Sequence, residues 1–495
     1  MFTSHLHPKL GATITALIWS LAGGLAATVL FFTGVGGIGV LAFVLLIVVA
    51  LLAGRRVVTI QAKIFLGLAS VTALLWLVRD SDWVLVPAAI GVCLMLATAV
   101  LFARGGDVFN VSWSMMWTYA TRFAGHFLLT PPWLAIGIQQ TLPLPGGRSW
   151  FGGVRVVALA TPILLALGLL LASADPVFAD VLAPDVSPHS LILHLVLAAL
   201  GGLAVACLWR CTVIRVIGAP AQSTTRLTRT EALVILFGVV TLFAGFVAIQ
   251  VATAHGLGEA TLADQGISVA DYARSGYFQL LAAVFLTAVV LISIDALRSN
   301  ACDNRRVEKV LSVVIVALAL AIAVVALQRL ALYVDTYGLT MLRLSCVPGA
   351  VWMVSLLVLT GGWVAGIWRT SHWLPAASAT MLVATVLAFA LVNPEAAVVQ
   401  YNVSHQTDTG LDVDYLASLS DDAVPALVGA LPTLAAPQRA QLTAALCTKP
   451  TPSRSWNTWS FVADRADSDL ATLCERFPDI DGSGSSLAVR AAPVH

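Results

Sequence analysis

Long apolar runs separated by short polar turns dominate the first 392 residues of the chain. A membrane-spanning helix needs about 20 mostly apolar residues, and eleven stretches approach that length. They cover about residues 11–33, 38–53, 64–78, 84–102, 154–173, 191–209, 232–254, 277–294, 310–334, 347–368 and 374–392. The third stretch is short and fits either a re-entrant or a tilted element. The pattern predicts an all-α, polytopic integral membrane protein with about eleven transmembrane helices.

The segment between the fourth and fifth runs has a different pattern. Residues 111–129 mix aromatic and methionine side chains with basic ones, which is typical of an amphipathic helix lying in the membrane interface. A coupling helix, or a re-entrant pair that returns through residues 133–142, is the alternative. We therefore expect a four-span region at 1–104, a cytoplasmic-side interfacial segment at 105–153 and a seven-span core at 154–392.

The tail from residue 393 onward is polar and acidic, yet it keeps helical spacing of Leu, Val and Ala. Four helices are predicted, at residues 411–419, 423–431, 437–446 and about 459–477. Asp421 or Asp422 is placed to cap the second of them. We expect a small helical extracytoplasmic domain at 393–480 and a disordered end at 481–495, which begins with a Gly/Ser-rich stretch.

Composition supports the membrane class. The chain is 59% hydrophobic and 11% charged, whereas a soluble domain has about 25% charged residues. Its mean hydropathy is +0.91. The net charge of +1 gives no reason to expect a nucleic-acid partner. Histidine and cysteine do not occur at metal-binding spacings such as CxxC or HExxH, so neither a metal nor a cofactor is predicted.

Basic residues orient the predicted spans. With the N-terminus in the cytoplasm, Lys and Arg gather in the inner loops, and the outer loops before the tail contain only Arg79, Arg274 and Arg343. This bias follows the positive-inside rule. An odd number of spans then places the C-terminus outside the cytoplasm. The predicted location is the cell (plasma) membrane, crossed many times.

An unusual density of charged and aromatic residues lies between the ninth and tenth runs. It comprises Arg329, Tyr333, Asp335, Tyr337 and Arg343. One interpretation is anchoring: Arg329 reaches the outer headgroups and the tyrosines belong to the aromatic belt. The other is a site in which the two arginines bind an anionic headgroup or a carboxylate, because charge inside a membrane protein often marks function.

Two further stretches face the same predicted compartment. Asp271, Arg274 and Gln279 lead into the eighth run, and Asp175 follows the fifth run just before a proline. A capped helix start and a helix stop are the simpler interpretations. Their shared face with the first cluster makes a common outer-face binding site the alternative hypothesis.

Cys447 and Cys474 are the only cysteines outside the predicted membrane region. In an oxidising compartment a disulfide between them would stabilise a small domain. The alternative is two buried thiols in a cytoplasmic tail, which would also reverse the topology. Asn402-Val-Ser404 fits an N-glycosylation sequon, whose meaning depends on the organism.

Several stretches resemble a bacterial polytopic membrane family of unknown function, the domain of unknown function 4153/4173-like group. They are Ser173-Ala-Asp-Pro-Val-Phe178, Asp271-Tyr-Ala-Arg-Ser-Gly-Tyr-Phe-Gln-Leu280, Tyr337-Gly-Leu-Thr-Met-Leu-Arg343, Asn393-Pro-Glu and Asp414-Tyr-Leu-Ala-Ser-Leu. The resemblance covers about residues 150–430. It implies a polytopic architecture and a bacterial envelope location, and it implies no activity or cofactor.

Three classes of function follow from these features. A non-enzymatic cell-envelope scaffold or sensor is favoured, because no catalytic constellation stands out and an external domain does. A transporter or flippase of an anionic lipid or small molecule would need polar residues at mid-membrane on several spans, or internal repeats. A lipid-linked transferase would need an outer acid; Asp80, Asp175, Asp271 and Asp335 are candidates. The expected partners are the lipid bilayer and an envelope protein or anionic lipid on the outer face; the oligomeric state stays open.

Overall fold

The protein is described by a computed structural model that covers residues 10–54, 57–134, 188–213, 227–252, 277–297, 305–368, 372–405, 410–448 and 454–476. The membrane-region helices are α1 (Leu10–Phe31), α2 (Gly37–Ala53), α3 (Ile60–Ala73), α4 (Leu75–Val78), α5 (Asp82–Leu101), α6 (Trp113–Leu128), α10 (Pro188–Val213), α11 (Arg229–Ala252), α14 (Tyr277–Leu297), α15 (Arg306–Tyr337), α16 (Met341–Ala365) and α17 (Leu374–Leu391). Over these ranges the fold contains helices and no β-strand, as the sequence predicts.

Nine helical stretches in the described ranges are long and apolar enough to cross a membrane. The apolar helix α2 is shorter, at 17 residues. The third predicted run forms α3 and α4 together, and Ile60–Val78 is long enough to span. The predicted run at 154–173 lies outside the described residues. A multi-pass membrane architecture is therefore established, and the count of eleven stays a prediction.

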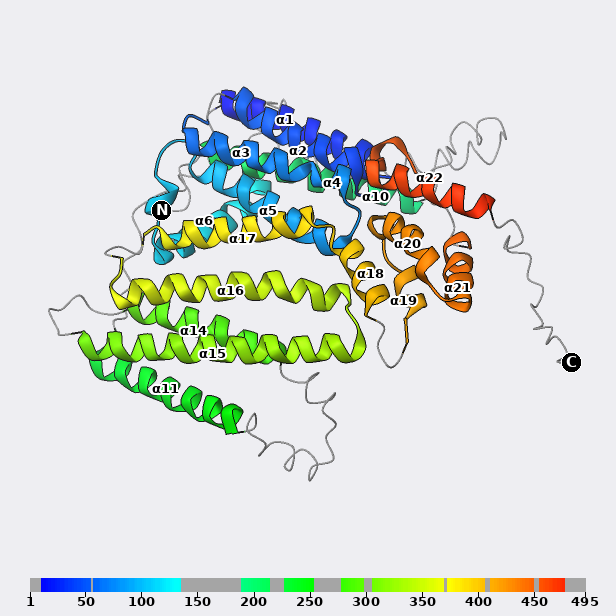
Figure 1. Cartoon of the computed structure of the whole chain (residues 1–495). Helices are drawn as coiled ribbons and strands as arrows, with labels where there is room; N and C mark the ends of the chain where they lie inside the picture. The colour runs from blue at the N-terminus through cyan, green and yellow to red at the C-terminus, as the bar shows by residue number, and fades with distance from the viewer. Residues whose placement is uncertain are drawn as a thin grey trace, which may run out of the picture.

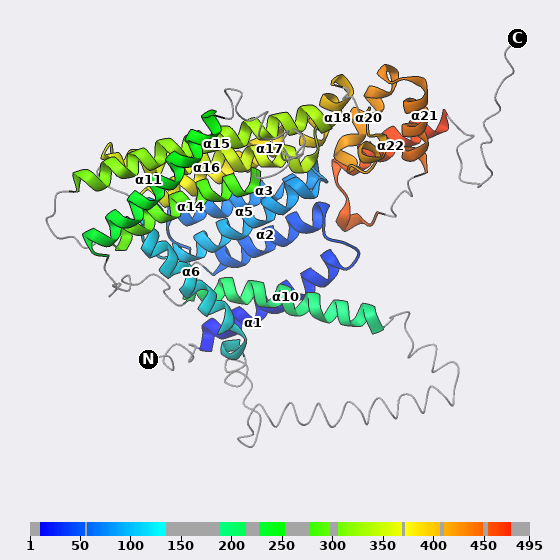
Figure 2. The same ribbon diagram turned by 90° about the horizontal axis from the view of Figure 1, so that it is seen from below.

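The membrane helices form two groups joined by α17 (Figures 1 and 2). Helices α1, α2, α3, α5 and α10 surround one apolar core, and α11, α14, α15 and α16 surround another. Helix α17 contacts both α16 and α5. Glycines allow the close crossing of α1 and α10: a Cβ added to Gly201 would lie 2.4 Å from the Cβ of Ala27. Small residues at such crossings are common in membrane proteins.

Helix α6 lies in the segment that the sequence predicts to be amphipathic. Its Trp117 and Leu128 are each 74% exposed, and Ser112 caps its first turn. The fully buried Arg210 of α10 donates a hydrogen bond from Nη1 to the carbonyl of His126, at 2.7 Å. An arginine at this position satisfies one of the free carbonyls in the last turn of α6. The contact fixes the end of α6 against α10.

The C-terminal helices pack around a separate apolar core, and we call residues 394–475 the C-terminal unit. Its helices are α18 (Pro394–Ser404), α19 (Val413–Ala417), α20 (Val424–Ala430), α21 (Ala436–Cys447) and α22 (Phe461–Glu475), with short 3₁₀ turns η4 (Asp421–Ala423) and η6 (Trp456–Thr458). Helices α19 to α22 match the four predicted ones. Helix α18 was not predicted. The sulfur atoms of Cys447 and Cys474 lie 2.01 Å apart.

The predicted cap of the second tail helix is wrong. Ser420 accepts the amide hydrogen bond of Asp422 at the start of η4. The carboxylate of Asp422 points instead toward the turn between α4 and α5. A carboxylate that is buried finds its strongest donors wherever backbone amides are left free, and here those amides come from a distant turn.

Candidate functional site

Three turns between membrane helices meet the C-terminal unit at the same end of the helix bundle (Figure 1). They are residues 32–36 between α1 and α2, residues 79–81 between α4 and α5, and residues 338–340 between α15 and α16. Each turn is hydrogen-bonded by a buried or partly buried polar side chain of the C-terminal unit: Asn457, Asp422 and Asn402, respectively. Ser455 also bonds to the first turn, through the hydroxyl of Thr33. The sequence-based topology also assigns these three turns to one face of the membrane.

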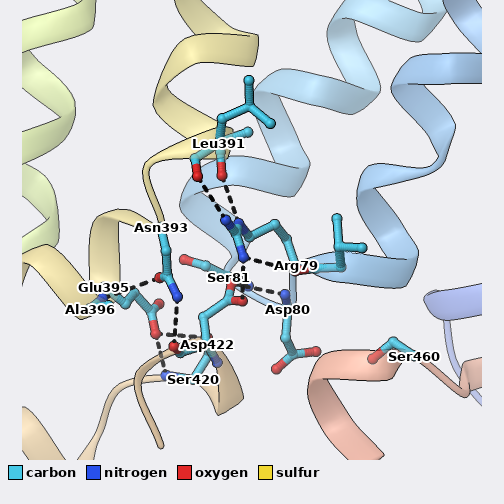
Figure 3. A network of polar contacts seen from close by, with 12 residues as sticks. Arg79, Asp80, Ser81, Leu391, Asn393, Glu395, Ala396, Ser420, Asp422 and Ser460 are labelled. Atoms are coloured by element: carbon cyan, nitrogen blue, oxygen red, sulfur yellow. Dashed lines mark hydrogen bonds and ion pairs between the residues drawn. The ribbon is translucent and has the colours of Figure 1, made fainter. Parts of the chain in front are cut away.

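One of these contacts involves Asp422, whose side chain has no solvent exposure. One carboxylate oxygen accepts hydrogen bonds from the backbone amides of Asp80 and Ser81, both at 2.9 Å. The other lies 3.8 Å from a guanidinium nitrogen of Arg79. We call Arg79, Asp80, Ser81, Asn393, Glu395 and Asp422 the acidic junction (Figure 3).

Arg79 connects this junction to the end of a third helix. Its Nε donates to the carbonyl of Ala390 at 2.6 Å, and its Nη2 donates to that of Leu391 at 3.1 Å. Both carbonyls belong to the last turn of α17, where a helix has no internal partners for its oxygens and favours positive charge. One side chain therefore ties α4, α17 and the C-terminal unit together.

Asn393 and Glu395 complete the junction from the start of α18. Asn393 has φ of 53°, a left-handed conformation that asparagine tolerates better than most residues. Its side chain caps α18 by accepting from the amide of Ala396, and donates to the carbonyl of Asp422 at 3.0 Å. The buried Glu395 accepts from the amide and hydroxyl of Ser420, at 2.9 and 2.7 Å. These acids are thus held by backbone and hydroxyl donors.

The junction carries more acid than base. Burial raises the pKa of Asp422 above its ordinary value of 3.8, and the amide donors and Arg79 offset only part of that rise. Burial, followed by repulsion from Asp421 and Asp422, raises the pKa of Asp80. Arg454 forms ion pairs with Asp421 and Asp467 nearby. Protonation of either raised acid relieves the crowding of negative charge.

Asn402 makes the matching contact with the turn between α15 and α16. Its amide group donates to the carbonyl of Leu339 and accepts from the amide of the same residue, both at 2.7 Å. The hydroxyl of Tyr415 accepts from the amide of Met341, also at 2.7 Å. The sequon nitrogen of Asn402 is therefore occupied in the folded protein, which disfavours its modification.

Asn457 makes the third contact, at the turn between α1 and α2. The amide of the almost fully buried Asn457 donates to the carbonyl of Leu30 at 2.7 Å and accepts from the hydroxyl of Thr33 at 2.8 Å. The carbonyl of Trp459 accepts from the amide of Ile38 at 3.1 Å. We call Leu30, Thr33, Gly37, Ile38, Asn457 and Trp459 the glycine clasp, because Gly37 permits the approach.

Glycine is required at this turn for two reasons. Gly37 has φ of +46°, which disfavours residues with a side chain. A Cβ there would also lie 2.1 Å from the carbonyl oxygen of Trp459. A Cβ on Gly39 would lie 2.7 Å from the carbonyl oxygen of Leu30. The glycine-rich turn thus lets two backbones meet.

Part of the predicted outer-face cluster comes together at the corner between α15 and α16. The guanidinium of Arg343 lies 4.0 Å from the ring centroid of Tyr333 and 5.9 Å from that of Tyr337. It also donates to the carbonyls of Tyr337 and Gly338 at the end of α15. Arg343, in the first turn of α16, therefore holds the end of α15 against the start of α16. Ligand binding by this corner stays a prediction.

The other described residues of the predicted cluster have different partners. Arg329 contacts Gln250 of α11 at 3.3 Å, and Asp335 accepts from the hydroxyl of Tyr401 at 3.3 Å. Gln279 is exposed on α14. The remaining three, Asp175, Asp271 and Arg274, lie outside the described residues.

Neither the acidic junction nor the glycine clasp is predicted from the sequence. The sequence predicts only that Asp421 or Asp422 caps a helix. The sequence does contain one signal of a polar contact here: two adjacent charged residues, Arg79 and Asp80, lie between two apolar runs. Their partner, Asp422, lies more than 300 positions away in the sequence, and no local pattern identifies it. Within the described ranges, no group of three or more His, Cys, Asp or Glu residues is placed to hold a metal ion.

A family model described as Domain of unknown function (DUF4153) matches residues 65–430, more than half of the chain. The match begins well before residue 150, where the resemblance in the sequence motifs starts. It contains the acidic junction and Asn402, and it leaves out the glycine clasp. No curated protein and no solved structure matches the chain.

Proposed function

Since the chain belongs to the family described as Domain of unknown function (DUF4153), we propose that it is a non-enzymatic scaffold or sensor of the bacterial cell envelope. The observation that carries the proposal is the seating of the C-terminal unit on three separate turns of the membrane region. A unit held at three points presents one fixed surface to partners. It also transmits a change in the packing of either helix group.

The chemistry of the acidic junction favours this function over catalysis. The carboxylates of Asp422 and Glu395 accept hydrogen bonds from backbone amides and from a serine hydroxyl. Such acids hold the polypeptide in place, and both side chains are buried away from solvent. A catalytic acid or base needs an oxygen within reach of a substrate proton.

The proposed topology has eleven spans, a cytoplasmic N-terminus and a C-terminal unit outside the cytoplasm. It is supported by the position of three turns at one end of the bundle and by the distribution of Lys and Arg. Fusion of alkaline phosphatase or a fluorescent protein after residue 480 tests it. Phosphatase activity is expected, and cytoplasmic fluorescence would overturn the topology.

Cys447 and Cys474 are proposed to form a disulfide in this compartment. Their Cα atoms lie 5.6 Å apart, and 27 positions separate them in the sequence. Closing a loop of that size contributes about 3.5 kcal/mol in the chain-entropy treatment. A membrane-impermeant maleimide should label these cysteines in intact cells only after reduction. Labelling without reductant would contradict the disulfide, and no labelling in either condition would contradict the exposed location.

Photo-crosslinking tests the scaffold function itself. A photoreactive amino acid replaces Arg439 or Arg465, which are exposed on α21 and α22. Both positions should yield adducts with one and the same envelope protein in intact cells, and the Arg79→Ala variant should lose them. Replacement of the buried Met341 serves as the control that yields none. Absence of a shared adduct at both exposed positions would overturn the scaffold proposal.

A further inference from the structure

Three aromatic residues occur within six positions at the start of α22. Trp456 is 62% exposed and Phe461 is 58% exposed, although both are large and apolar. The rings of Trp459 and Phe461 lie 4.6 Å apart, edge to face. We call Trp456, Trp459 and Phe461 the aromatic edge. The exposure of Trp456 and Phe461 is unusual for a unit whose other apolar residues surround a core.

The glycine clasp fixes the depth of this edge relative to the membrane helices. Asn457 bonds to the carbonyl of Leu30, which lies inside the candidate span that ends at Phe31. Trp459 bonds to the amide of Ile38, the second residue of the apolar helix α2. The aromatic edge therefore lies level with the last turn of α1 and the first turn of α2. That level is where a spanning helix passes through the headgroup region.

The neighbouring surface continues the apolar character. Phe32 and Val35, in the turn between α1 and α2, are 37% and 72% exposed. Helix α22 then runs away from the membrane helices (Figure 1) and becomes polar, with exposed Asp464 and Ser468. The exposed side chains of α22 thus change from apolar near the membrane helices to polar farther from them.

From these positions we propose that the aromatic edge lies in the lipid–water interface and contacts phospholipid directly. Tryptophan suits this layer because its ring is apolar and its N–H is polar, which explains the aromatic belts of membrane proteins. The C-terminal unit is then held by lipid as well as by the three turns. Contact with phospholipid is expected on either side of the membrane, so it does not require the proposed topology.

Spin labels on the full-length protein in phospholipid nanodiscs test the proposal. In a background where Cys93, Cys207, Cys211, Cys302 and Cys346 are replaced by alanine, single Trp456→Cys and Phe461→Cys variants carry the label. Ser468→Cys is the matched control: it lies on the same face of α22 as Phe461, two turns or about 10 Å farther along. Collision with oxygen reports lipid, and collision with a water-soluble nickel chelate reports water.

Labels at 456 and 461 should collide more with oxygen than with nickel, and the label at 468 should show the reverse. Preferential collision with nickel at both aromatic positions would overturn the proposal. So would protection from both reagents, which would show that a protein partner or a second copy covers the edge. Two aromatic positions are labelled, so misfolding of one variant leaves the other informative.

Discussion

The acidic junction and the glycine clasp achieve the same connection by opposite physical means. The junction buries a charged carboxylate and surrounds it with amides and a guanidinium. The clasp buries a neutral amide and relies on close backbone approach at Gly37. A buried charge is costly and therefore sensitive to its partners and to pH, whereas a close steric fit is sensitive to a single methyl group. The residues matched by the family model include the acidic junction and leave out the glycine clasp.

The largest effect is expected from Arg79→Ala. It leaves the unexposed Asp422 without its cation and α17 without its C-terminal donors, so the folded protein should lose about 3–5 kcal/mol of stability. Thermal unfolding in detergent measures the loss. Arg305→Ala is the control, because the Arg305–Asp295 pair is partly exposed and should contribute at most about 1 kcal/mol. Equal effects of the two variants would contradict the importance of burial.

Gly37→Ala should cost about 2–3 kcal/mol, because the new Cβ meets a carbonyl oxygen that belongs to the backbone. Gly36→Ala is its neighbour and control: Gly36 is extended, and a Cβ there meets nothing within 4 Å. In the Gly37→Ala variant the amide hydrogen of Ile38 should exchange faster with solvent, while those of Asp80 and Ser81 stay protected. Simultaneous opening of both regions would mean that the junction and the clasp are one cooperative unit.

A change in pH should distinguish the two regions. The pKa values of Asp80 and Asp422 are raised by docking, so the docked state binds more protons than the undocked state above pH 3.8. Docking should therefore weaken as pH rises from 3.8 through the raised pKa values, by at most about 1.4 kcal/mol per pH unit for each proton. The charged groups facing these acids are Arg79, Glu395, Asp421 and Arg454.

Exchange of the Ser81 amide, followed against pH, reports this dependence. Asp422→Asn should flatten the profile, and the amide of Ile38 in the clasp should follow pH much less. An unchanged profile in the Asp422→Asn variant would assign the dependence to another group.

The smallest effect is expected from Thr33→Val, which removes a hydroxyl that donates to Asn457 and is hydrogen-bonded to the hydroxyl of Ser455, at the edge of the clasp. The loss should be about 1–2 kcal/mol, because each of the two hydrogen bonds usually contributes about 1 kcal/mol. Thr28→Val is the control, because that hydroxyl bonds only within its own helix turn. A difference between the two in thermal unfolding measures the contacts that Thr33 makes with Ser455 and Asn457.

The sequence predicts the membrane helices well because each is a local pattern of apolar residues. Four tail helices are predicted for the same reason, and α18 was missed because Asn393-Pro-Glu begins a polar stretch. The site is different. Asp422 and Ser81 are 341 positions apart, and Asn457 and Leu30 are 427 apart. Hydrogen-bonding capacity is visible in a sequence, but the partner of a buried Asp or Asn depends on packing.

The same separations govern how the protein is made. Synthesis at about 5–20 residues per second delivers Asp422 tens of seconds after Ser81. During that interval the amides at the start of α5 lack the acceptor that they have in the finished chain. A nascent or prematurely ended chain therefore exposes three unfilled turns that a complete chain hides.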